Sequence, residues 1–229
     1  MPLVRRAVAE FLGTFGLVFF CCGSVVATAL PGTDLTLVGV ALTQALALSI
    51  MVTATMNISG AHLNPAVTVG FLAARRITPN DAWVYVIFQL AGGLAGAMLV
   101  KALMPTAAVL ATAAGTPSLQ SGISLAGAIA LEAVLTFFLM VAIYGTAVAP
   151  TAPKVGGFGI GLTLFFLIVV GGNLTGAAMN PARAFGPAVI SGMYVGQAVY
   201  WIGPVIGALV AMVVWERLLL APEAPAADA

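Results

Sequence analysis

The chain has 229 residues, of which 62% are hydrophobic and 7% are charged, and its formal net charge is +1. A soluble globular domain carries roughly 25% charged residues, so this chain cannot cover a water-facing surface with polar groups and is suited to lipid instead. The small net charge excludes a broad basic surface and argues against nucleic acid as a partner.

The first predicted membrane span covers residues 11–33, which contain no Asp, Glu, Lys or Arg. Arg5 and Arg6 precede it, as in a signal peptide, but the apolar run exceeds the roughly 7–15 residues of a cleaved segment. We therefore expect the span to be retained.

Cys21 and Cys22 are adjacent and lack metal-ligand spacing, so we interpret both as small core residues. On that interpretation the protein should resist mercurials.

Further charge-free windows follow along the chain. Residues 82–100, 133–153 and 155–182 each suffice for one spanning helix, which needs about 20 apolar residues. Residues 35–74 and 184–215 form windows of 40 and 32 residues, too long for a single crossing. Each long window must therefore hold a full span and a segment that enters the membrane without crossing it.

The long windows are explained by the breaks Asn64-Pro65 and Asn180-Pro181. Asn is a good helix N-cap, and Pro suits the first helical turn. Each pair therefore starts a short helix at membrane depth, which must be buried in protein or line an aqueous cavity. The sequence predicts an all-α membrane protein with six spans and two re-entrant half-helices.

The basic residues predict the orientation. Six Lys and Arg residues fall on one side of this topology, and Lys101 alone falls on the other, leaving aside Arg183 within the second half-helix. By the positive-inside rule, both termini are cytoplasmic and the loops 30–34 and 105–121 face outward. The six are Arg5, Arg6, Arg75, Arg76, Lys154 and Arg217.

An internal repeat relates the two halves, about 1–115 and 116–221, followed by a short tail at 222–229. The matched features are Glu10 with Glu132, the two Asn-Pro-Ala motifs, and Gln89-x-x-Gly92 with Pro204-x-x-Gly207. Because each half holds three spans, the halves must be inverted, with the half-helices meeting N-terminus to N-terminus. The spacings Gly92-x-x-x-Gly96 and Gly203-x-x-x-Gly207 favour close helix contact, which we expect between spans 3 and 6.

The motif segments, Ser59 to Thr68 and Gly176 to Pro187, resemble those of the major intrinsic proteins, the aquaporin family, and the similarity covers nearly the whole chain. The two Asn-Pro-Ala motifs, 116 residues apart in over-long apolar windows, make it specific. The resemblance implies one aquaporin-type channel domain over residues 1–229. It also implies a homotetramer in the lipid bilayer, with water and small neutral solutes as cargo.

The motifs have a direct physical interpretation. Asn64 and Asn180 each offer an amide NH2 where the half-helices meet, so one water molecule can accept from both, which interrupts a proton-conducting chain. Pro65-Ala66 and Pro181-Ala182 complete the motifs, and each helix N-terminus adds roughly half a positive charge that repels cations. The alternative is a pair of structural caps without a pore.

Three further residues are expected to support the pore loops. Glu10 and Glu132 are intramembrane carboxylates, which are costly unless they are hydrogen-bonded. They could relay protons, but the repeat and the resemblance favour acceptance of loop N–H groups. His62 is placed in the cytoplasmic vestibule, since a solitary His is a poor metal-site candidate. The loop carbonyls of 60–63 and 176–179 are expected to act as acceptors along the pore.

The resemblance also implies a selectivity filter of Gln44, Ile168, Ala177 and Arg183. Arg183 would donate to solutes and oppose cations; the alternative is an arginine that extends to the membrane surface. Strict water channels of the family place Phe and His at the first two positions. Ile168, Ala177 and Arg183 instead look like those of plant vacuolar-membrane and nodulin-type members, which admit larger solutes.

Three functions remain open on the sequence. The first is a passive channel for water, with ammonia, hydrogen peroxide or urea as further cargo, that excludes protons and ions. The second is a glycerol or metalloid-hydroxide facilitator. The third, a membrane enzyme or junction protein, fits poorly because no nucleophile–base set, metal cluster or extramembrane domain is evident; no cofactor is expected. The short termini favour a prokaryotic channel in the cell (inner) membrane.

Overall fold

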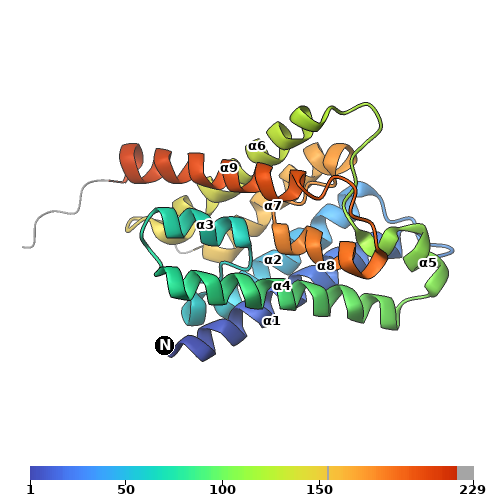
Figure 1. Ribbon diagram of the computed structural model, residues 1–229, viewed down its shortest axis with the longest axis horizontal. Helices are drawn as coiled ribbons and strands as arrows, with labels where there is room; N and C mark the ends of the chain where they lie inside the picture. Colours follow the sequence, from blue (N-terminus) through green and yellow to red (C-terminus); the bar gives the residue numbers. More distant parts are fainter. Residues whose placement is uncertain (154, 221–229) are drawn as a thin grey trace, which may run out of the picture.

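The computed structural model describes residues 1–153 and 155–220 and consists of helices packed side by side (Figure 1). Within these ranges, six helices are long and apolar enough to cross a membrane. They are α1 (Leu3–Ala27), α2 (Leu37–Ser59), α4 (Pro79–Leu103), α6 (Leu125–Ile143) continued by η2 (Tyr144–Val148), α7 (Gly156–Thr175), and α9 (Val199–Val214) continued by η3 (Trp215–Leu219). The six-span prediction is confirmed.

Two short helices, α3 (Pro65–Ala73) and α8 (Pro181–Ser191), start at the predicted Asn-Pro breaks. In Figure 1, α3 lies in the half of the molecule that holds the N-terminus, and α8 lies in the other half. The sequence did not predict α5 (Thr106–Ala111) or the 3-10 turn η1 (Ala113–Gly115), which lie in the α4–α6 connection. Lys154 and the proposed tail 222–229 lie outside the described residues.

The first span begins earlier than the charge-free window suggested. Arg5, Arg6 and Glu10 all belong to α1. Arg6 donates to Asp81 at the start of α4, and Glu10 is fully buried. A charged residue can therefore belong to a membrane helix when it lies at the end of the helix or has hydrogen-bond partners inside the protein. A prediction based on charge-free windows misses such residues.

The helix contacts follow the inverted repeat. α1 packs on α2 and α4 as α6 packs on α7 and α9, and α2 lies against α7 at the junction of the halves. Each half-helix contacts the third span of the other half, since α3 packs on α9 and α8 packs on α4. The prediction that the two halves are inverted copies is confirmed by this exchange.

The glycine pairs bring helices together within each half rather than between halves. A Cβ added to Gly96 would lie 2.6 Å from the Phe15 oxygen of α1, and one added to Gly203 would lie 2.7 Å from the Glu132 Cβ of α6. The predicted contact between spans 3 and 6 is therefore wrong. The spacing identifies a helix that approaches another closely, but it does not identify the partner.

Candidate pore

The two asparagine motifs begin the half-helices and bind them to each other. Asn64 accepts from the Ala66 N–H at 2.9 Å, and Asn180 accepts from the Ala182 N–H at the same distance. Both asparagines have extended backbones, as an N-cap residue requires. Their amide nitrogens are then left to bond elsewhere.

Each amide nitrogen donates to the loop of the opposite half. Asn64 Nδ2 lies 2.8 Å from the Met179 carbonyl oxygen, and Asn180 Nδ2 lies 2.9 Å from the Leu63 carbonyl oxygen. An amide NH2 carries two hydrogens, so each asparagine keeps one for another acceptor. The bonds join chain segments that are 115 and 117 residues apart.

Glu10 is fully buried and accepts from the loop before the first motif. Its donors are Ser59 Oγ at 2.6 Å, the N–H groups of His62 and Leu63 at 3.0 and 2.7 Å, and Gln89 Nε2 at 2.8 Å. Four donors surround two carboxylate oxygens, which offsets the cost of burying the group. The carboxylate fixes the loop geometry.

Glu132 repeats this arrangement in the second half. It accepts from Thr175 Oγ1 at 2.6 Å and from the N–H groups of Ala178 and Met179 at 3.0 and 2.7 Å. Among the described residues no fourth donor reaches it, and Pro204 occupies the position that matches Gln89 in the repeat. The correspondence extends to Tyr200, which donates to the Thr175 carbonyl as Tyr85 donates to Ser59.

The loops before the motifs follow an unusual backbone course. Gly60 ends α2 with φ 88°, and Ala61 and Leu63 both have φ 50°. Gly176, Ala177 and Met179 match them with φ values of 80°, 44° and 50°. The left-handed conformation costs roughly 1–3 kcal/mol for a residue with a Cβ, which the bonds to the two glutamates offset.

These loops present carbonyl oxygens that remain available. Among the described residues, no donor reaches the carbonyls of 60–62 or 176–178. The carbonyls of Leu63 and Met179, by contrast, already accept from the opposite asparagines. The series of free carbonyl acceptors predicted for each loop therefore stops one residue earlier, before Leu63 and before Met179.

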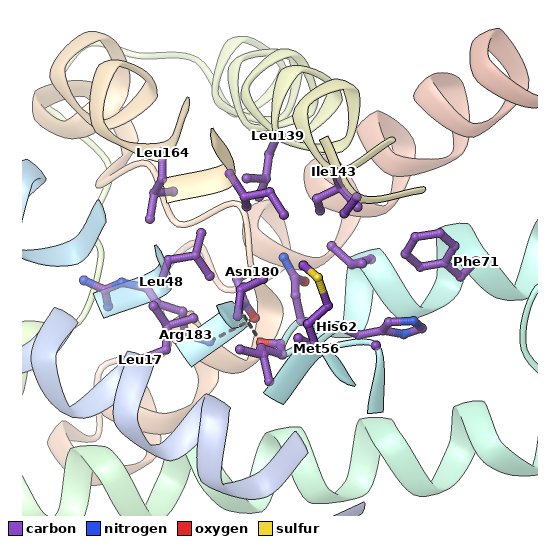
Figure 2. Close-up of a pocket in the computed structure, with 18 of the residues that line it drawn as sticks. Leu17, Leu48, Met56, His62, Phe71, Leu139, Ile143, Leu164, Asn180 and Arg183 are labelled. Atoms are coloured by element: carbon purple, nitrogen blue, oxygen red, sulfur yellow. Dashed lines mark hydrogen bonds between the residues drawn. The ribbon is translucent and has the colours of Figure 1, made fainter. Parts of the chain in front are cut away.

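A cavity of about 450 Å³, here called the main cavity, contains both asparagines in its wall. In Figure 2, Asn180 lies between Arg183 on one side and His62 and Phe71 on the other. Most of the remaining wall is aliphatic, which leaves the spare amide hydrogens and loop carbonyls as its principal polar groups. The aliphatic residues include Leu17, Leu48, Val52, Leu139, Ile143 and Leu164.

A second cavity of about 370 Å³, the distal cavity, is lined by the 115–118 and 172–176 segments. Gln44 and Arg183 line both cavities, Ala177 lines the main cavity, and Ile168 lines the distal cavity. The four residues proposed for the filter are therefore gathered where the two cavities adjoin, although they come from four separate segments.

Arg183 lies on the first turn of α8 and is 4% exposed. One terminal nitrogen donates to the Gly115 carbonyl at 2.9 Å, while its Nε has no partner among the described residues. Gly115 was not identified from the sequence. The contact could not be predicted from the residue type, because the acceptor is a main-chain oxygen that every residue has.

Gln44 is 4% exposed and turns its amide nitrogen toward α1. Nε2 lies 3.4 Å from both the Cys21 carbonyl oxygen and Ser24 Oγ. Both distances are long for hydrogen bonds, so the amide is only loosely held. The structure thus brings Gln44 to the cavity wall, in the register that the sequence spacing required.

His62 lines the main cavity and its Nδ1 lies 3.1 Å from Thr68 Oγ1. The ring stacks on Phe71 with centroids 4.7 Å apart. Beyond Phe71, Arg76 pairs with Glu216, which also accepts from Tyr144. The bond to Glu216 raises the pKa of Arg76 above its ordinary value. Of these groups, His62, Phe71 and Arg76 line the main cavity.

Six spans, two half-helices joined at their N-termini, and cavities that adjoin in the interior define a polytopic membrane channel. Residues 1–215 match the family described as "Major intrinsic protein". The chain belongs to this family, the aquaporins, and is an integral membrane protein.

Curated relatives agree with that assignment. "Aquaporin TIP4-4" of Zea mays is 40% identical over 226 residues, covering 95% of this chain and 88% of the relative. "Probable aquaporin NIP4-2" of Arabidopsis thaliana is 37% identical, covering 90% and 71%. These relatives are of the TIP and NIP types, which confirms the expected branch resemblance.

A solved structure shows the same fold. The X-ray structure of the aquaglyceroporin from Plasmodium falciparum has a TM-score of 0.83 and 25% identity, covering 95% of this chain and 97% of that chain. The predicted aquaporin fold is confirmed by this similarity over nearly the whole length.

Proposed function

We propose that this chain conducts water passively and excludes ions and protons. The observation that supports this most directly is the pair of asparagines, each with one amide hydrogen committed to the opposite loop and one left over. A water oxygen in the main cavity can accept from both, which turns its own hydrogens away from the centre. Proton transfer along a water chain would then be interrupted there.

Ion exclusion rests on two sources of positive potential. The half-helices α3 and α8 direct their N-termini, each worth roughly half a positive charge, toward the same central point. Arg183 adds a full charge where the two cavities adjoin. We assign Arg183, Gln44, Ile168 and Ala177 to the filter, and Glu10, Glu132 and His62 to support of the pore loops.

We extend the proposed cargo to ammonia, hydrogen peroxide and urea. Ile168 gives the filter an aliphatic wall and Ala177 leaves space, while Arg183 and Gln44 keep donors and acceptors available. An unmatched polar group in such a place costs about 1–3 kcal/mol. These small solutes can match both kinds of partner. The names of the TIP-type relatives identify them as aquaporins, which supports water as the main cargo.

The test is stopped-flow measurement of water, ammonia, hydrogen peroxide, urea and glycerol entry into proteoliposomes, with protein-free vesicles as the control. We expect water flux and flux of at least one of the three extra solutes. Gln44→Phe with Ile168→His should remove the extra flux and spare water. Water flux alone in the wild type would indicate a strict water channel.

The second candidate is glycerol or metalloid-hydroxide transport, which the wide filter and the likeness to an aquaglyceroporin fold favour. In the same assay, glycerol flux comparable with that of water would select this candidate.

We further propose one channel domain over residues 1–229, a homotetramer, the cell membrane as location, and cytoplasmic termini.

A further inference from the structure

An ion pair joins the two halves of the chain beside the main cavity. Arg76 follows α3 of the first half, and Glu216 lies in η3 of the second. Arg76 Nε and one terminal nitrogen both donate to the Glu216 carboxylate, and the Tyr144 hydroxyl donates to it at 2.9 Å. An ordinary exposed ion pair contributes little, but a forked pair with a third bond is held more firmly. The Arg76 side chain is therefore fixed in one position.

One member of this pair borders the cavity and the other does not. Arg76 lines the main cavity, whereas Glu216 is not part of its wall. The Arg76 side chain is 40% exposed, so the cavity reaches the surface beside it. Its N–H donates to the Phe71 carbonyl at 2.9 Å. In Figure 2, Phe71 and Arg183 lie on opposite sides of Asn180, so the cavity has an arginine toward each end.

Aromatic rings pack behind the ion pair. Tyr144 is fully buried, and its ring centroid lies 5.6 Å from that of Trp215 and 5.6 Å from that of Phe71. The Arg76 guanidinium lies 6.0 Å from the centre of the Tyr144 ring. A guanidinium without its carboxylate would avoid this apolar layer, because burying an unpaired charge is costly. The aqueous space beside it, which includes the cavity, is the remaining place.

The inverted repeat gives this pair no counterpart at the other end of the molecule. Counted from the two Asn-Pro-Ala motifs, Gly192 matches Arg76, and counted along the third span of each half, Lys101 matches Glu216. A glycine and a lysine cannot form an ion pair. Contacts that the shared framework requires, such as those of the two buried glutamates, occur in both halves. A pair found in one half alone is better explained by a role at that end of the cavity.

We infer that Glu216 is a positioning residue of the pore, which holds Arg76 against the wall and keeps its guanidinium out of the passage. Without the carboxylate, the long arginine side chain extends into the aqueous end of the main cavity. There it narrows the passage and binds water through its N–H donors. This inference rests on the proposed water conduction, because it assigns the residue by its effect on solute passage.

The flux experiment compares the wild type, Glu216→Gln, Arg76→Met and the double variant in proteoliposomes. The two single variants remove the same ion pair, so a merely structural role predicts the same loss in both. We expect the water permeability per protein to fall several-fold in Glu216→Gln, to stay clearly higher in Arg76→Met, and to recover in the double variant. Equal permeability of the two single variants, or no recovery in the double variant, would overturn the inference.

Thermal unfolding of the same proteins in detergent is the control for stability. The two single variants lose the same hydrogen bonds between Arg76 and Glu216, so their melting temperatures should fall by similar amounts. The double variant should melt no higher than either, although its permeability recovers. A permeability that follows the melting temperature through all the variants would show a structural role and contradict the positioning role.

A labelling measurement in detergent separates the positioning role from water conduction. Ile143 lines the same cavity, so Ile143→Cys in a Cys21→Ser, Cys22→Ser background reports access of neutral iodoacetamide to the interior. Adding Glu216→Gln should slow the reaction, and adding Arg76→Met as well should restore it. Labelling that Glu216→Gln leaves unchanged would overturn the inference. Slower labelling in Glu216→Gln, together with a wild type that conducts no water, would contradict the proposed function and retain the positioning of Arg76.

Discussion

Arg183 is bonded at one nitrogen and unpartnered at another within the same buried side chain. The terminal nitrogen is anchored to the Gly115 carbonyl, and Nε is buried without a partner among the described residues. Anchoring reduces the side-chain entropy lost when a solute binds. The arginine can therefore present a donor in a fixed place.

Arg183→Val should keep water flux but increase cation or proton leak. Removing one hydrogen bond to a charged group changes its energy by about 1.5–3 kcal/mol, which corresponds to on the order of 10- to 100-fold in relative passage. A pH-sensitive dye inside proteoliposomes measures the proton leak, and Arg183→Lys keeps the charge as a control. Unchanged leak and unchanged solute selectivity in Arg183→Val would remove Arg183 from the filter.

Substitution of the two buried glutamates tests whether their carboxylates hold the loops before the motifs in place. Glu10→Gln replaces an acceptor oxygen by an NH2 group that faces the Leu63 and His62 N–H donors or the Gln89 amide. Each lost bond to a charged group is worth about 1.5–3 kcal/mol, so the melting temperature in detergent should fall clearly. Glu132→Gln should have a similar effect.

Gln89→Leu is the matched control, because it removes only one of the four donors to Glu10. Its destabilisation should be smaller than that of Glu10→Gln. If both glutamate variants melt like the wild type, the carboxylates do not hold the loops. Reduced proton flux with unchanged melting would favour the relay alternative.

At the scale of helices, close approach within each half depends on glycines without room for a side chain. Gly96 lies against the backbone of α1 at Phe15 and Phe19, and Gly203 lies against α6 at Ile129 and Glu132. Because Glu132 also accepts from the Met179 N–H, helix spacing and loop position are coupled in the second half. Displacing α6 from α9 would move the acceptor of the Met179 loop.

Gly96→Val should destabilise the protein by about 1–3 kcal/mol, the usual cost of overpacking. Gly23→Ala serves as the matched control on α1, since a Cβ there has no neighbour within 4 Å. Thermal unfolding in detergent and the yield of monodisperse protein measure the effect. Equal melting temperatures of the two variants would show that the α1–α4 contact can accommodate a larger side chain at residue 96.

Local signals predicted the elements well, and contacts between distant segments poorly. Asn64 and Asn180 mark the half-helix starts because capping involves only the next few residues. The partner of Arg183 is a carbonyl 68 residues away, and the partners of Gly96 depend on helix pairing.

At the scale of the whole molecule, the two ends of the bundle differ in charge. The N-terminus and the end of α9 lie at one end, and α5 lies at the opposite end (Figure 1). Arg6 near the start of α1 pairs with Asp81, and Arg76 pairs with Glu216 of η3, so both pairs belong to the first end. The positive-inside rule places the first end in the cytoplasm. Thr33 and Pro153 are exposed and lie in connections at opposite ends.

In a background with Cys21→Ser and Cys22→Ser, a membrane-impermeant thiol reagent should label Thr33→Cys from outside intact cells. Pro153→Cys should react only after the membrane is opened. Gel-shift or mass detection of the label measures both. The opposite pattern would reverse the proposed orientation without affecting the fold.

The reciprocal asparagine bonds also constrain the order of assembly. Leu63 and Asn64 leave the ribosome long before Met179 and Asn180, so their mutual bonds cannot form until almost the whole second half has been synthesised. Until then the exposed amide and carbonyl of the first half require another partner, and lipid offers none. Water or other protein groups must therefore satisfy these polar atoms until the second half is in place. The centre of the bundle is thus the last part of the chain to reach its final hydrogen bonding.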